Sequence, residues 1–357
     1  MKKKDKMNIL MISPGLDKSL GGMSTVVNNY FESEIVNEIN LKHISTYKPG
    51  RLYTKVFKAI SAYINIIISA IKYKIDIIHI HMASRGSFYR KSIIVILMNL
   101  LKKRVIVHLH GGGFDKFYTK ESSKLAQRYI KYILNKSDLL IVLSEEWKEK
   151  IINYGIETKV EVLFNGVYLP KINLYKSKNK NITFLGRLTE EKGFFDLLKI
   201  AKVLNKDNNM KIDFNIGGSG DTEYINHLVT DYGIEENINL NGWVNSVEKD
   251  EILQNTGIFI LPSYFEAMPM SILEAMSYGI PIITTNVGGI PAIIEQGING
   301  YMREPGDIDS MVNDIKQILY NDEFRCELSK NSYYKIKQHF SMEKQNKELI
   351  KLYKSII

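Results

Sequence analysis

The chain has 357 residues, which is long for a single hydrophobic core and sufficient for two domains. Its content of 45% apolar and 24% charged residues is typical of a globular protein and argues against a disordered chain. A single cysteine, Cys326, excludes an internal disulfide and fits a reducing compartment such as the cytosol.

The net charge of +9 is unevenly distributed along the chain. Residues 1–170 contain 27 Lys and Arg against 14 Asp and Glu, whereas the remainder contains 21 against 25. A basic first half predicts an anionic partner. We expect an anionic membrane surface and no nucleic acid, because the basic residues lack interleaved aromatic side chains and no nucleic-acid-binding motif is present.

The N-terminal apolar run is too short for a signal peptide, and no segment offers some twenty uninterrupted apolar residues, so we expect no membrane span. Residues 8–13 predict the first strand. Gly21 and Gly22 follow it and open a helix, an order typical of a nucleotide-binding fold in which glycine lets backbone approach phosphate. Residues 54–73 and 92–101 predict apolar helices with basic flanks, which could pack on a sheet, rest on a membrane, or do both.

Two predicted strands, residues 75–81 and 105–110, each end in His-x-His. Because successive strand side chains alternate between faces, both imidazoles of each pair lie on one face. Four such histidines could indicate a metal-dependent hydrolase, but no carboxylate or cysteine lies at ligand spacing nearby, and we expect no metal. His110 differs because three glycines follow it and leave its ring open at the end of the strand.

The rest of the first half is expected to form a helix over residues 114–135 and strands over residues 138–144 and 160–164. The polar segment 171–180 lacks a periodic apolar pattern and predicts a linker. In the second half, the strand over residues 182–185 is followed by Arg187 and, five residues later, Lys192 just ahead of a helix. Both cations can reach a pyrophosphate, although each alone would be an ordinary surface base.

Two further strand ends carry candidate ligand contacts. Residues 212–216 lead into a glycine-rich loop with Gly218, whose backbone N–H groups could contact phosphate or ribose. The strand over residues 238–240 precedes Trp243 and Val244, where main-chain atoms could meet a nucleobase. A core aromatic at a strand end is the simpler interpretation of Trp243.

The segment 258–285 predicts strand, loop, helix and strand. Its strands cover residues 258–261 and 280–284, and Pro269 is expected as the first helical residue. Glu266 lies before the helix and Glu274 more than a turn inside it. Between them the helix N-terminus offers a phosphate site, so the two carboxylates suit hydroxyl-rich groups on either side of a phosphate. Loops 287–291 and 297–300 and helices over residues 307–320, 322–338 and 341–357 complete the chain.

The stretch FEAMPMSILEAMSYGIPIITT, followed by VGGIPAIIEQGINGYM, resembles the donor-binding signature of the retaining glycosyltransferases of family four. Ala267 departs from that signature, where glycine is most frequent. The resemblance implies an α/β chain with the GT-B fold, in which two Rossmann-like domains with parallel sheets face a central cleft. The implied division is an acceptor-binding domain at 1–170, a linker at 171–180, a nucleotide-sugar-binding domain at 181–340, and a helix at 341–357 returning to the first domain.

The same resemblance assigns roles to individual residues. Arg187 and Lys192 would stabilise the leaving diphosphate, Glu266 would hold hydroxyls of the donor sugar, and His110 would orient that sugar. Glu274 would hold the ribose. The implied catalytic residues are His110, Arg187, Lys192 and Glu266, and the implied donor-binding residues are Gly21, Gly22, Gly218, Trp243, Val244, Met268, Pro269, Met270 and Glu274.

The resemblance therefore implies a retaining, metal-independent hexosyltransferase with no cofactor. We expect it to use a UDP-sugar, or secondly a GDP-sugar, and to modify a glycan or lipid-linked acceptor in surface polysaccharide synthesis. It would be cytoplasmic and peripheral on the inner face of the cell membrane. Two alternatives stay open: a sugar-nucleotide epimerase or hydrolase with the same two-domain plan, and a non-catalytic partner in a glycosyltransferase complex.

Overall fold

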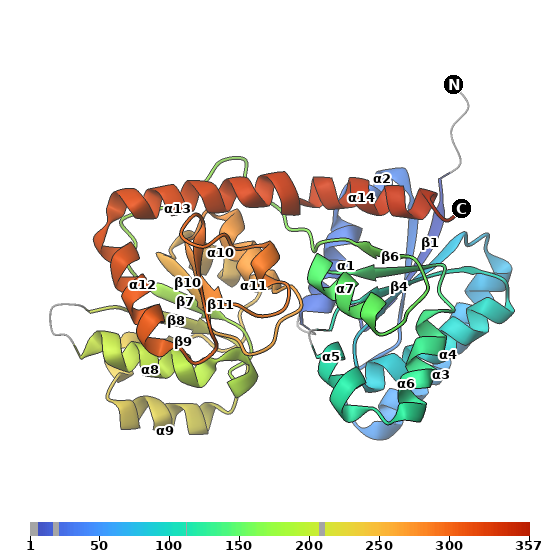
Figure 1. Cartoon of the computed structure of the whole chain (residues 1–357), viewed down its shortest axis with the longest axis horizontal. Coiled ribbons are helices and arrows are strands. Elements are labelled where there is room, and N and C mark those ends of the chain that lie inside the picture. The colour runs from blue at the N-terminus through green and yellow to red at the C-terminus, as the bar shows by residue number, and fades with distance from the viewer. Residues whose placement is uncertain (1–5, 17–20, 112, 207–210) are drawn as a thin grey trace. The chain divides into compact units, whose positions relative to one another are not determined.

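The computed structural model describes residues 6–16, 21–111, 113–206 and 211–357. The chain divides into two compact units. The first comprises Met1–Gly166 together with Met342–Ile357, and the second comprises Val167–Ser341. Each unit is a parallel sheet with helices, so each is Rossmann-like (Figure 1).

In the first unit the strands are ordered β2-β1-β3-β4-β5-β6, and every pairing is parallel. The central strands are buried on both faces because helices cover both, as is usual for a parallel sheet. The strands are β1 (Asn8–Ser13), β2 (Asn40–Ser45), β3 (Ile77–Met82), β4 (Arg104–Leu109), β5 (Leu139–Val142) and β6 (Val160–Val162). The helices are α1 (Gly22–Glu32), α2 (Ile35–Glu38), α3 (Leu52–Lys72), α4 (Gly86–Leu100), α5 (Phe114–Lys116), α6 (Lys124–Leu134), α7 (Glu145–Asn153) and the terminal α14 (Met342–Lys354).

In the second unit the order is β12-β11-β10-β7-β8-β9, again with parallel pairings throughout. The strands are β7 (Ile182–Leu185), β8 (Phe214–Gly217), β9 (Ile238–Leu240), β10 (Ile258–Leu261), β11 (Ile282–Thr285) and β12 (Gly300–Arg303). The helices are α8 (Phe194–Asn205), α9 (Thr222–Tyr232), α10 (Ser246–Gln254), α11 (Met270–Ser277), α12 (Ile308–Tyr320) and α13 (Asp322–Lys335).

Two strands escaped sequence-based prediction, and both are edge strands. β2 has the sequence NLKHIS and is partly exposed along its length, while β12 begins in the segment that we expected to be a loop. An edge strand pairs on one side and tolerates polar side chains. Neither strand therefore carries the continuous apolar run that marked the buried strands.

Three helix boundaries also differ from expectation. Pro269 is the residue that precedes α11 rather than its first residue, with an extended ψ of 119°. α4 begins six residues earlier than expected, at Gly86. The single helix expected over residues 114–135 is instead α5, a π-helical turn at Phe117–Glu121 and α6, which starts anew where the Ser123 hydroxyl accepts from the Ala126 N–H.

The segment expected to be a linker, residues 171–180, is packed into the second unit. Asn173 donates to the Ser329 hydroxyl at 3.0 Å, and Tyr175 donates to the Gly257 carbonyl at 2.8 Å. A Cβ on Gly279 would lie 2.2 Å from Oδ1 of Asn173, so the segment lies directly against the end of α11. The polar residues interpreted as linker are thus structural anchors, which composition alone does not distinguish.

One helix contrasts with the expectation that no segment could span a membrane. Over Tyr53–Lys72, α3 is long and apolar enough to cross a bilayer by length and composition alone, and little of this stretch is buried. Scattered lysines interrupt the apolar run, which is why a criterion of uninterrupted residues missed it.

Candidate active site

The polar site of the second unit lies where the order of its strands reverses direction. β7 is the first strand of this sheet, β8 follows on one side, and β10 lies on the other. Ligands of open parallel sheets bind beyond the carboxyl ends of the strands at such a switch point. The loops after β7 and β10 carry Arg187, Lys192 and Glu266, so three predicted residues occupy this position.

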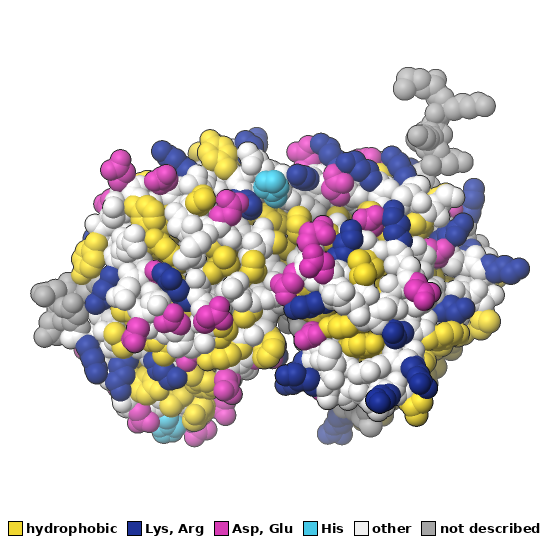
Figure 2. Space-filling view, viewed as in Figure 1, with side chains coloured by type: hydrophobic (Ala, Val, Ile, Leu, Met, Phe, Trp, Pro, Cys, Tyr) yellow, Lys and Arg dark blue, Asp and Glu magenta, His cyan; other side chains and the backbone are white. Residues whose placement is uncertain are grey.

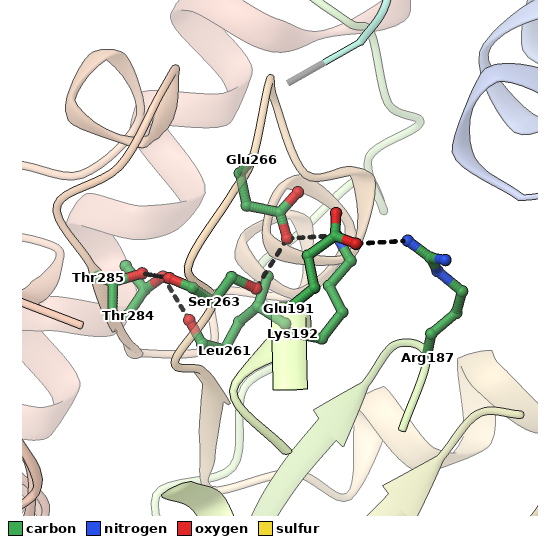
Figure 3. A network of polar contacts seen from close by, with 8 residues as sticks. All are labelled: Arg187, Glu191, Lys192, Leu261, Ser263, Glu266, Thr284 and Thr285. Atoms are coloured by element: carbon green, nitrogen blue, oxygen red, sulfur yellow. Dashed lines mark hydrogen bonds and ion pairs between the residues drawn. The ribbon is translucent and has the colours of Figure 1, made fainter. Parts of the chain in front are cut away.

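The structure brings Lys192 and Glu266 into direct contact (Figure 3). Lys192 Nζ lies 2.6 Å from Glu266 Oε1, and the Ser263 hydroxyl donates to the same oxygen at 2.9 Å. The Glu266 side chain is only 7% exposed, so a charge-neutralising partner is what permits its burial. Within the described part of the chain both bonds end on Oε1, which leaves Oε2 to accept from a ligand.

Two glycines bring the backbone close enough to form this pair. Gly193 has a φ of 68°, and a Cβ there would lie 1.8 Å from the Pro262 carbonyl oxygen. Gly288 has a φ of 55°, and its Cβ would lie 1.8 Å from the Glu266 carbonyl oxygen. No side chain fits at either contact. Lys192 and Glu266 are thus held from both sides by loops that can approach because they carry glycine.

Arg187 lies at the outer edge of the same network. Its guanidinium is 3.6 Å from the Glu191 carboxylate, and both side chains are more than half exposed. Figure 3 shows Glu191 between Arg187 and the Lys192–Glu266 pair. An exposed pair of this kind contributes little to stability, so Arg187 can exchange its carboxylate partner for a phosphate at low cost.

Glu274 is held separately, by a partner that sequence reasoning missed. Lys249 Nζ, on α10, lies 2.6 Å from Glu274 Oε1, and both side chains are mostly buried. The two residues are 25 positions apart, and a lysine in a polar helix gives no sequence signal for such a contact. Lys249 therefore fixes the carboxylate expected to hold a ribose.

The other predicted donor contacts surround these pairs. Met268, Pro269 and Met270 are buried at the start of α11. Trp243 is half exposed rather than a core residue, and the Val244 side chain lies near Gly217 at the end of β8. Gly218 differs from expectation, because its N–H donates to the Gly242 carbonyl at 2.7 Å and is therefore occupied within the protein.

Gly21, Gly22 and His110 belong to the first unit. Gly21 precedes α1 with a φ of 98° and Gly22 is the first residue of that helix, while His110 follows β4. Residue 112, in the middle of the three glycines after His110, lies outside the described residues. His110 Nε2 is 2.8 Å from Nδ1 of His81, so the ring is oriented by a neighbouring imidazole.

His110 is the outermost member of a stack of four imidazoles. His79 and His81 stack with ring centroids 4.3 Å apart, and His108 and His110 lie 4.1 Å apart. His79 also joins His108 at 3.3 Å and the Tyr353 hydroxyl of α14 at 2.7 Å. The stack follows from the register of β3 and β4, in which His81 is directly opposite His108.

Burial keeps the stack neutral. It lowers the pKa of His79 and of His110 to about 3 and holds the pKa of His81 and His108 well below the ordinary value, with further lowering from charges on neighbouring imidazoles. Burial likewise lowers the pKa of the fully enclosed Lys91 to about 7. Its ammonium donates to the His81 carbonyl oxygen and the Ser87 hydroxyl.

His79, His81 and His108 bring nitrogen atoms within 4.8 Å of one another, close enough to raise the question of a metal. Imidazole lone pairs lie in the ring plane, and zinc binds at about 2.0–2.1 Å. His79 and His81 are stacked with an interplanar angle of 20°, so their lone pairs lie in nearly parallel planes and do not converge on one ion. The arrangement favours a hydrogen-bonded stack, and a metal-free enzyme stays a prediction.

Comparison with known proteins identifies the class. Residues 168–335 match the family model "Glycosyl transferases group 1", and residues 24–169 match "Glycosyltransferase Family 4". The chain is 31% identical over 303 residues to an Escherichia coli UDP-Gal:alpha-D-GlcNAc-diphosphoundecaprenol alpha-1,3-galactosyltransferase, covering 79% of this chain and 76% of that one. It is also 29% identical to an uncharacterized 41.2 kDa protein in the cps region of Klebsiella pneumoniae, covering 86% and 88%.

Solved structures support the same conclusion at the level of fold. A sucrose-phosphate synthase from Thermosynechococcus elongatus superposes with a TM-score of 0.79 at 16% identity, covering 98% of this chain and 99% of that one. HepE of Anabaena, solved with UDP, gives 0.75 at 16% identity, covering 98% and 100%. The two parallel-sheet units are those of the GT-B fold. The chain belongs to the group 1 glycosyltransferases, and it is a transferase of bacterial polysaccharide biosynthesis.

Proposed function

We propose that the chain is a retaining, metal-independent glycosyltransferase that moves a hexose or N-acetylhexosamine from a UDP-sugar to a lipid-linked or glycan acceptor. The observation that carries the proposal is the Lys192–Glu266 ion pair at the switch point of the second unit. A GDP-sugar is the second choice of donor. The E. coli relative, whose name specifies UDP-galactose and a diphosphoundecaprenol-linked acceptor, and the UDP complex of HepE favour UDP.

The ion pair suits transfer of a sugar away from a diphosphate. An ammonium has three N–H donors, and the bond to Glu266 uses one of them. Lys192 can therefore keep its position on Glu266 while donating to phosphate oxygens. A cation fixed in advance stabilises the charge that develops on the leaving diphosphate without reorganising at the moment of reaction. In this proposal Lys192 and Arg187 perform the charge stabilisation that a metal would otherwise supply.

Glu266 acts as a binding group in this scheme. Its charge is compensated by Lys192 at 2.6 Å, which weakens it as a nucleophile, and its Oε2 can accept hydroxyls of the donor sugar. Glu274, positioned by Lys249, holds the ribose. His110 is neutral because burial lowers its pKa to about 3, and because Nε2 is bonded to His81, the ring offers the sugar its Nδ1. We place the enzyme in the cytoplasm, peripheral on the inner face of the cell membrane.

Calorimetric titration with UDP and with GDP, each with and without EDTA, tests the donor site. We expect UDP to bind more tightly, EDTA to have no effect, and Glu274→Ala to weaken binding about tenfold by removing the ribose contact. Glu251→Ala is the matched control, because Glu251 is an exposed carboxylate on α10. Absence of UDP and GDP binding would exclude the proposed donor site, and loss of binding in EDTA would exclude metal independence.

A further inference from the structure

The helix α3 has two apolar faces, and only one of them is used within the first unit. On the inner face Ala62, Ile66 and Ala70 are each 1% exposed, and Ile66 and Ala70 belong to the hydrophobic core. On the outer face Phe57 is 76% exposed and Ile71 is 69% exposed. The exposed apolar side chains of this face, hereafter the outer face, are Tyr53, Val56, Phe57, Ile60, Ile64, Ile68 and Ile71.

The outer face is continuous along the helix. At 3.6 residues per turn its positions fall within one arc of roughly 120°, opposite the buried arc. From Tyr53 to Ile71 the arc is about 27 Å long. Scattered exposed hydrophobic residues are normal on a protein surface, but a contiguous stripe of this length marks an interaction site.

The surroundings of the outer face are strongly basic. Residues 39–114 contain 13 Lys and Arg and a single acidic residue, Asp76. The Asp76 carboxylate accepts from the Asn8 N–H at 2.8 Å and is thus occupied at the start of the sheet. Arg51 and Lys55 are exposed at the N-terminal end of α3, and Lys72 and Lys74 at its C-terminal end. Figure 2 shows Lys and Arg side chains spread over the visible face of the first unit.

We propose that the outer face of α3 docks on the surface of a bilayer that contains anionic phospholipids, with the helix lying parallel to that surface. A basic rim around an apolar stripe matches the headgroup–acyl boundary, where apolar side chains enter and cations remain with the lipid phosphates. The helix does not cross the bilayer, because Ala62, Ile66 and Ala70 bind it to the core and would have to leave that core for a span.

A second copy of the chain fits the outer face poorly. A two-fold interface is self-complementary, so the same patch would meet itself. The basic rim would then face a basic rim with no acidic residue on α3 to compensate it, and like charges across an interface are repulsive. The proposal deepens the membrane location proposed above. It does not depend on the donor chemistry, which we assigned to the second unit.

Co-sedimentation with vesicles tests the proposal on the full chain. We would compare vesicles of phosphatidylcholine alone with vesicles that also contain phosphatidylglycerol. The test variant is Phe57→Ser, Ile60→Ser and Ile64→Ser combined, and the matched control is Tyr224→Ser, Val247→Ser and Tyr320→Ser, three similarly exposed positions of the second unit. We expect the wild type and the control to bind anionic vesicles, and the test variant to lose roughly tenfold or more of its partition coefficient.

A second variant, with two charge reversals, separates the contribution of the basic residues from that of the apolar side chains. Lys55→Glu combined with Lys72→Glu is expected to weaken binding to anionic vesicles severalfold, and raising the salt to about 0.5 M is expected to do the same to the wild type. UDP affinity, measured on the same samples, should be unchanged in both α3 variants. Equal vesicle binding by wild type and test variant would overturn the proposal, as would a wild-type dimer that the test variant dissociates. A wild type that binds vesicles but does not bind UDP would instead contradict the proposed donor site and leave the membrane proposal intact.

Discussion

The two units share an architecture but hold their polar groups in opposite ways. In the second unit the polar residues are charged and paired, Lys192 with Glu266 and Lys249 with Glu274, each at 2.6 Å. In the first unit the polar residues at the corresponding sheet edge are imidazoles that burial keeps neutral. A site of paired charges can exchange a partner for a charged ligand, whereas a neutral stack can orient a group but offers no charge to a diphosphate.

This difference supports a division of labour between the units. Charge stabilisation of a leaving diphosphate requires fixed cations, and Arg187 and Lys192 belong to the second unit. In the proposed scheme His110 positions a sugar hydroxyl without competing for the diphosphate, because burial lowers its pKa and leaves it uncharged at neutral pH. The basic surface of the first unit, including α3, is then free for another partner, which we propose to be lipid.

The largest expected effect is the loss of transfer in Lys192→Ala. Removing a preorganised charge donor from a transition state typically costs about 10²–10³ in kcat. Lys199→Ala is the matched control, because Lys199 lies on α8, beyond the turn that carries Lys192, and is paired with Asp196. Release of UDP from a UDP-sugar in the presence of acceptor is the measurement. Equal rates for Lys192→Ala and Lys199→Ala would show that Lys192 does not supply the stabilising cation.

The sequence predicted the second unit more completely than the first, for a physical reason. Arg187, Lys192 and Glu266 follow strands whose apolar runs are easy to recognise, and loops at adjacent strand ends must meet at one edge of a sheet. The Lys249–Glu274 contact and the packing of residues 171–180 depend on tertiary approach between polar segments. Such contacts leave no periodic pattern in the sequence.

In the first unit the pairing of each His-x-His on one face followed from strand geometry, but the four-ring stack did not. It requires the register that sets His81 opposite His108 and the return of α14 with Tyr353 to His79. Edge strands β2 and β12 were missed because a strand with one neighbour need not be apolar. Sequence periodicity predicts which side chains are buried. It does not reveal strands that are half exposed or contacts between residues far apart in the sequence.

Acidification is expected to destabilise the first unit selectively. The folded-state pKa values of His79 and His110 are about 3, below the ordinary value of 6.5, so the unfolded chain binds more protons between these values. Stability is therefore fully present above pH 6.5 and falls as the pH is lowered, towards a limiting slope of about 1.4 kcal/mol per pH unit for each buried histidine.

Urea denaturation at a series of pH values gives the unfolding free energy, and its slope against pH measures this effect. A range of about pH 4.5 to 7 covers roughly the titration of free histidine. His79→Asn should flatten the slope by one proton, whereas His227→Asn, an exposed position on α9, should not. A slope shared equally by both units would contradict the contrast between a neutral and a charged edge.

The smallest of these effects concerns the glycines of the second unit. Gly288→Ala places a Cβ 1.8 Å from the Glu266 carbonyl oxygen at a φ of 55°, so backbone must shift and Glu266 must move with it. We expect a loss of about 2–4 kcal/mol in unfolding free energy of the second unit, together with weaker UDP binding. Gly233→Ala is the matched control, since its φ of 65° is similar but its Cβ meets open space. The cost there should be the left-handed conformation alone, about 1–2 kcal/mol. If both substitutions lower the unfolding free energy equally and UDP binding is retained, close packing of the loops does not hold the Lys192–Glu266 pair in place. The ion pairs of this unit would then be less rigid than their contacts indicate.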